Sequence, residues 1–197
     1  MTDSILSMDE TFDFDLMSLV NPNTIGAGIY FSKLLHNKVP LIIQGPKCTT
    51  KGGIVSTTKK QYVDIVYKNS DVVLLEWFED LQKTIIDLIY KEKDNLFEDD
   101  IEKDDIENLL ISPLKIFKGG QYYTFRSFVN NNSFLDDNSQ FKCYDEHVNE
   151  IPYTAIDNES VLIPLFEFKG VKISSKNFSL EIDLKQVMKL SKNESVF

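Results

Sequence analysis

A run of lysines is the strongest chemical signal in this sequence. Residues 16–63 contain six lysines and no aspartate or glutamate, although the whole chain carries a net charge of −10. Four of the lysines gather in the stretch IIQGPKCTTKGGIVSTTKKQYVDIVY: Lys47, Lys51, Lys59 and Lys60. Ordinary surfaces intersperse both signs of charge, so this stretch indicates contact with an anion. The alternative is a loop whose lysines only keep it soluble.

A second signal lies in QYYTFRSFV (121–129), which contains Arg126, the only arginine of the chain. On a strand, side chains alternate between two faces, so Tyr122, Thr124, Arg126 and Phe128 share one face. An arginine between two exposed rings is typical of a platform on which bases stack, and Tyr62 is a further candidate ring. The alternative is that the strand buries rings on both faces, and a slip of one residue would exchange the faces.

The sequence does not contain the residue patterns that catalysis, metal binding or nucleotide binding would require. The two histidines, His36 and His147, are far apart and have no ligand-like spacing. The stretch GPKCTTKGG lacks the Gly-Lys-Ser/Thr ending of a phosphate loop, and EDDIEKDD lacks the glycine and ligand offsets of a calcium loop. We therefore expect no enzyme activity, no cofactor and no metal site.

The totals indicate the setting in which the protein works. A chain of 197 residues suits one domain with elaborations. It has no apolar run long enough for a membrane, no signal-peptide pattern at its start, and only Cys48 and Cys143 without CxxC spacing. We expect a soluble, intracellular protein with no membrane contact. Residues 64–107 are strongly acidic, with fifteen acids against five bases, and residues 169–192 turn basic again.

The order of apolar and polar residues predicts mainly β structure with one long helix. Leu74, Phe78, Leu81, Ile85 and Ile89 recur at helical spacing, which predicts a helix over about 72–97. Strands are expected over 39–44, 61–67, 141–144, 161–168, 171–174 and 178–188, and as a hairpin over 114–129 that turns at Gly119-Gly120. The lysine-rich residues between 45 and 58 are expected to form a loop or finger. One helix among about six to eight strands predicts an antiparallel barrel with an inserted helix.

The order of three segments carries a family resemblance. KKQYVDIVY enters the helix LLEWFEDLQKTIIDLIY, a polar hairpin follows at YDEHVNEI, and LFEFKGVKI pairs with the closing strand FSLEIDLKQVM. Over about residues 40–190 this arrangement resembles the T7-like single-stranded DNA-binding proteins, and more closely their relatives in nucleocytoplasmic large DNA viruses.

The resemblance implies an OB-fold-like Greek-key barrel of the mainly β (α+β) class, with the helix inserted between strands. It divides the chain into an acidic, turn-rich N-terminal arm (1–38), the barrel domain (39–190) and a short C-terminal tail (191–197). It also implies binding of DNA strands exposed in replication, recombination or repair. The phage-type proteins end in a long acidic tail that docks replication proteins. Here the sequence ends in MKLSKNESVF, where Glu194 is the only acid after Asp183. Either the tail role is absent or another segment has it, and the candidates are 1–15 and 98–107.

Two functions follow from these signals. The first is a non-enzymatic single-strand binder at the viral replication site, with a homodimer as one possible assembly. Its expected DNA contacts are Lys47, Lys51, Lys59, Lys60, Tyr62, Tyr122, Arg126, Phe128, Lys169, Lys172 and Lys176. The second is a structural protein of the virion, a minor capsid or core component that uses its β module and N-terminal arm.

Overall fold

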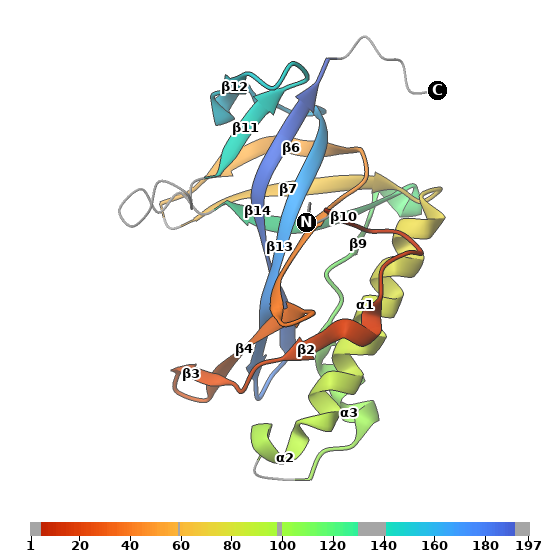
Figure 1. The fold of residues 1–197 in the computed structure, drawn as a ribbon, viewed down its shortest axis with the longest axis vertical. Coiled ribbons are helices and arrows are strands. Elements are labelled where there is room, and N and C mark those ends of the chain that lie inside the picture. Colours follow the sequence, from red (N-terminus) through yellow and green to blue (C-terminus); the bar gives the residue numbers. More distant parts are fainter. Residues whose placement is uncertain (1–4, 59, 98–99, 130–140, 192–197) are drawn as a thin grey trace.

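The protein is mostly β-strand, with a single long helix along one side (Figure 1). The computed structural model describes residues 5–58, 60–97, 100–129 and 141–191. Within these ranges, all fourteen strands join through hydrogen bonds into one continuous sheet. None of the helices in the described ranges is both long and apolar enough to cross a membrane. The expected fold class, a mainly β barrel of OB-fold type with an inserted helix, is confirmed.

Two long antiparallel strands form the spine of the sheet. β13 (Val161–Ser174) and β14 (Phe178–Leu190) run along the long axis of the molecule, and β6, β7 and β10 cross them (Figure 1). Their pairing shifts register between Leu165 and Phe166 and again between Phe168 and Gly170. Such bulges bend a strand and increase its twist, which lets the pair curve around the core.

Further strands extend the spine on both sides. β4 (Ile29–His36), β5 (Val39–Gln44) and β6 (Cys48–Ser56) pair with β13, whereas β8 (Leu110–Ile111), β10 (Tyr122–Val129) and β11 (Lys142–Asp145) pair with β14. β7 (Gln61–Lys68) lies between β6 and β10. The smaller strands are β1 (Leu6–Ser7), β2 (Met17–Leu19), β3 (Asn23–Gly26), β9 (Lys115–Phe117) and β12 (Glu150–Ile151). Three short 3-10 helices span Phe14–Leu16, Lys118–Gly120 and Tyr153–Ala155.

The expectation of a loop between 45 and 58 is wrong for most of that segment. β6 occupies Cys48–Ser56 and pairs with β7, and Gly52-Gly53 forms a bulge inside the strand, with φ of +83° and +68°. The glycine pair that suggested a turn instead supplies the positive φ angles that a bulge requires.

The long helix begins where the apolar stripe predicted, but it ends at Lys91 and not near residue 97. α1 covers Val72–Lys91, and a separate turn, α2 (Lys93–Leu96), follows it before α3 (Lys103–Leu109). The five stripe residues of α1 are all buried, together with Trp77 and Ile86. Phe78 packs against Phe125 of β10, with ring centroids 5.4 Å apart. The helix therefore closes the inner side of the sheet.

The described part of the N-terminal segment contributes to the same core. β1 pairs with β5, and Met8 and Phe12 are buried. The ring centroid of Phe12 lies 5.4 Å from that of Trp77 on α1. A domain boundary at residue 38, and a tail beginning at 191, stay predictions.

The bulge in β6 generates a stability prediction with a matched control. A Cβ on Gly53 would lie 2.3 Å from the carbonyl oxygen of Ile156, whereas a Cβ on Gly52 would meet nothing within 4 Å. Both residues have positive φ, so each alanine substitution costs about 1–2 kcal/mol from the backbone alone. We expect Gly53→Ala to cost about 3–4 kcal/mol in total, because overpacking adds to the strain.

Urea denaturation of the two variants measures this difference in the free energy of unfolding. Equal losses for Gly52→Ala and Gly53→Ala would contradict the close approach of β6 to Ile156.

Candidate nucleic-acid interface

The outer surface of four neighbouring strands carries most of the predicted site. In the pairing of β7 with β10, Tyr62 stands opposite Phe128 and Asp64 opposite Arg126. In the pairing of β9 with β10, Phe117 stands opposite Tyr122. Because side chains alternate along each strand, these residues share one face. We call it the aromatic face, and its members are Lys51, Lys60, Tyr62, Asp64, Phe117, Lys118, Tyr122, Arg126 and Phe128.

This face points away from the core. Phe125, the neighbour of Arg126 in sequence, is buried against α1, so α1 lies on the opposite side of β10 from the aromatic face. The side chain of Arg126 is 49% exposed, and Tyr62, Tyr122 and Phe128 are half-buried. The alternative that β10 buries rings on both faces under the helix or the N-terminal segment is therefore wrong.

Arg126 is held in a fixed plane at the centre of the aromatic face. Its Nε donates to Oδ1 of Asp64 at 2.8 Å, and its Nη2 donates to Oδ2 at 2.9 Å. The guanidinium carbon lies 3.8 Å from the centroid of the Tyr62 ring. A two-bond fork of this kind fixes the orientation of the group as well as its position. The hydrogen bond to Asp64 raises the pKa of Arg126 above its already high ordinary value, so the group stays charged.

Lysine amino groups lie over the other rings of the face. The Nζ atom of Lys60 lies 4.7 Å from the centroid of Phe128, and that of Lys51 lies 4.5 Å from the centroid of Phe117. Lys118 lies between Phe117 and Tyr122, at 5.6 and 5.4 Å from their centroids. Each ring therefore has a positive charge beside it, as a strand with alternating bases and phosphates requires.

A hollow of about 1350 Å³ adjoins the Phe117 end of the face. The basic residues that line it are Lys47, Lys51, Lys68 and Lys118, and its acidic residues are Asp9, Asp71 and Glu159. Phe117 and Tyr122 belong both to its wall and to the aromatic face. The hollow thus brings Lys47 to the same region as the β6 and β10 residues.

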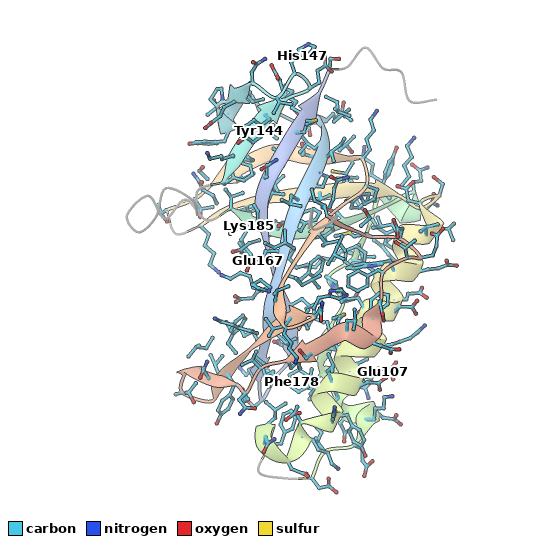
Figure 2. All side chains as sticks on the ribbon, viewed as in Figure 1. Glu107, Tyr144, His147, Glu167, Phe178 and Lys185 are labelled. Carbon is cyan, nitrogen blue, oxygen red and sulfur yellow. The ribbon has the colours of Figure 1, made fainter. Side chains whose placement is uncertain are left out.

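The three predicted lysines of the second basic segment lie elsewhere. Lys169 and Lys172 are on β13, and Lys176 is in the exposed turn between β13 and β14. That turn lies near the end of the long axis marked by Phe178, away from β6 and β7 (Figures 1 and 2). The Nζ atom of Lys169 lies 3.3 Å from Oδ2 of Asp183. Lys59 falls outside the described residues.

Sequence reasoning missed the residues of the aromatic face that precede β10. Phe117 and Lys118 lie at the end of β9 and in the turn that follows it. The hairpin KIFKGGQYY already held the signal, because a turn at Gly119-Gly120 brings Phe117 beside Tyr122.

Three groups capable of catalysis, Cys48, Cys143 and His36, are buried inside the protein. Burial raises the pKa of the Cys48 thiol far above its usual range and that of Cys143 to about 12, so neither is a nucleophile near neutral pH. Nε2 of His36 lies 3.0 Å from the carbonyl oxygen of Asp13, inside the protein. Among the described residues, no group of three or more His, Cys, Asp or Glu could hold a metal ion.

No protein-family model matches the sequence, and no curated protein matches it. Among solved structures, the chain is similar to the single-stranded DNA-binding protein from bacteriophage Enc34. The match to its complex with single-stranded DNA has 8% identity and a TM-score of 0.50, and covers 91% of this chain and 98% of that one. The match to a C-terminal truncation of that protein has 9% identity and a TM-score of 0.50, and covers 89% and 96%.

The chain is also similar to gp2.5, a single-stranded DNA-binding protein encoded by bacteriophage T7. This match has 13% identity and a TM-score of 0.40, and covers 79% of this chain and 97% of that one. At identities of 8–9%, the two matches with a TM-score of 0.50 show a likeness of fold alone. In that fold, the phage Enc34 protein and this chain are structural neighbours across almost their full lengths.

Proposed function

We propose that this protein binds single-stranded DNA without strong sequence preference and without catalysing a reaction. The observation that carries the proposal is the guanidinium of Arg126, stacked on Tyr62 and clamped by Asp64 on an outward strand face. Such a plane offers its open side to a base, and every base has a π face. The complex of the structurally similar phage Enc34 protein with single-stranded DNA supports the choice of ligand.

The aromatic face selects single strands by its chemistry. The bases of a duplex are stacked on one another and cannot reach flat protein rings, whereas the bases of a single strand can. The charge of Arg126 is balanced by Asp64, so Arg126 acts mainly as a stacking surface. Lysines supply the positive charge that follows the phosphates, and we assign that role to Lys47, Lys51, Lys59 and Lys60.

The setting proposed for this activity is viral DNA replication, recombination or repair inside the host cell. Membership of the large-DNA-virus branch of these proteins belongs to the same proposal. Acidic segments at 1–15 and 98–107 are the proposed contacts for replication proteins, because an acidic surface complements a basic partner. The described acids of the second segment include Glu102, Asp104 and Asp105, all exposed.

The deciding experiment is a titration of a labelled single-stranded oligonucleotide with the full-length protein, followed by fluorescence anisotropy. We expect tight binding at low salt, weaker binding at physiological salt, and little displacement by duplex competitor. Absence of binding at low salt would overturn the proposal and favour the virion structural role. Equal competition by duplex would overturn the single-strand preference.

Removing the stacking surface is expected to weaken binding at every salt concentration. For Arg126→Ala combined with Phe128→Ala, we expect a loss of about 1–3 kcal/mol per stacked base. Tyr153→Ala is the matched control, because Tyr153 is a surface ring (38% exposed) in a short 3-10 helix off the aromatic face. An unchanged dissociation constant for the double variant would place the site elsewhere.

Removing the lysines is expected to change the salt dependence. Each lysine that contacts a phosphate contributes about 0.7 to the slope of log K against log salt for a single strand. Alanine at all four of Lys47, Lys51, Lys59 and Lys60 should therefore flatten the slope markedly. Alanine at Lys83 and Lys103, which pair with acids on the helices, serves as the control and should leave the slope unchanged. Identical slopes for the two sets would refute the phosphate assignment.

A further inference from the structure

A second ring flanked by lysines lies on β4, next to the predicted contact Lys172. In the pairing of β4 with β13, Phe31 stands opposite Lys172, and Lys33 stands opposite Gly170. Their neighbours Ser32 and Leu34 are buried, so Phe31 and Lys33 point outward. Phe31 is half-buried and Lys33 is exposed. We call Phe31, Lys33 and Lys172 the β4 patch.

The ring of Phe31 owes its position to Gly170. Its Cζ atom lies 2.8 Å from the point where a Cβ on residue 170 would stand. The carbonyl oxygen of Ser32 lies 2.1 Å from the same point. Only glycine permits this approach, so the ring lies directly over the β13 backbone, beside Lys169.

The β4 patch is linked to the aromatic face through one strand pairing, one ion pair and one pair of sequence neighbours. Phe128 of β10 stands beside Asp183 of β14. Oδ2 of Asp183 forms an ion pair with Nζ of Lys169, at 3.3 Å. Lys169 directly precedes Gly170, the glycine beneath the Phe31 ring. Neighbouring strands are about 4.8 Å apart, so the three steps from β10 over β14 and β13 to β4 span about 14 Å across the strands.

The acids along this path are largely balanced by lysines. Asp183 pairs with Lys169, and Oε2 of Glu167 lies 3.2 Å from Nζ of Lys185. Figure 2 shows Glu167 and Lys185 close together on the β13–β14 spine. Glu181 of β14 stands opposite Gly170, at the margin of the path. With Lys33 and Lys172 added, the far end of the path is positive.

We propose that the β4 patch is a second stacking site, which takes the continuation of the strand bound on the aromatic face. A base stacks on Phe31, and the flanking phosphates contact Lys33 and Lys172. The inference rests on the proposed function and adds a consequence of its own: a strand long enough to span both sites binds more tightly than a strand that covers the aromatic face alone.

The test compares two oligonucleotides, of about 6 and about 16 nucleotides, within the range of site sizes for such folds. In the wild-type protein we expect the longer strand to bind more tightly. Phe31→Ala should weaken the longer strand roughly 5-fold or more and leave the shorter one unchanged. Tyr30→Ala is the matched control, because Tyr30 is the adjacent, partly exposed ring on the same strand and points to the other face.

A second variant tests the patch in case Phe31→Ala fails to fold. Lys33→Gln with Lys172→Gln removes the charge of the patch without removing packing, and should flatten the salt slope for the longer strand only. If the wild-type protein binds both strands and neither variant affects the longer one selectively, the inference is overturned while the proposed function stands. If the wild-type protein binds neither strand, the proposed function fails, and the inference fails with it.

Discussion

The antiparallel pairing of β13 with β14 is the constraint on which the rest of the molecule depends. Each strand pairs with its partner along one edge and with several shorter strands along the other, so β4, β5 and β6 join on one side and β8, β10 and β11 on the other. A flat pair could not bring these neighbours around a common core. The bulges near Phe166 and Gly170 supply the bend, and Gly170 also lets β4 approach closely.

The same geometry reconciles an acidic protein with the polyanionic ligand that we propose for it. Net charge of −10 opposes any broad contact with DNA, so the proposed binding requires a surface where the local charge differs. The inner side of β10 packs on α1. Because the apolar stripe of α1 faces inward, its acids, such as Glu76 and Glu79, are exposed on the opposite side of the helix. The outer side carries the rings and lysines. One strand thereby separates the helix from the proposed DNA path.

Sequence patterns predicted those parts of the site that follow from alternation along a single strand. The outward face of 61–67 and of 121–129, and hence Tyr62, Arg126 and Phe128, came from period-two spacing alone. The bulge in β6 was missed because two adjacent glycines have the same φ requirement in a turn and in a bulge. Asp64 and Arg126 are 62 residues apart in the sequence, and their salt bridge depends on how β7 and β10 align. No local sequence pattern encodes that alignment.

That salt bridge explains why arginine, used once in 197 residues, stands at this position. A lysine there would place a point charge beside Asp64, without a plane to stack on Tyr62 or on a base. The guanidinium satisfies the carboxylate along one edge while its carbon lies 3.8 Å from the centroid of the Tyr62 ring, so charge neutralisation and stacking do not compete for the same atoms. A buried ion pair of this kind would be costly, but the half-exposed side chain of Arg126 stays hydrated. Under the proposed function, the pair orients a stacking surface, and affinity for phosphate is assigned to the lysines.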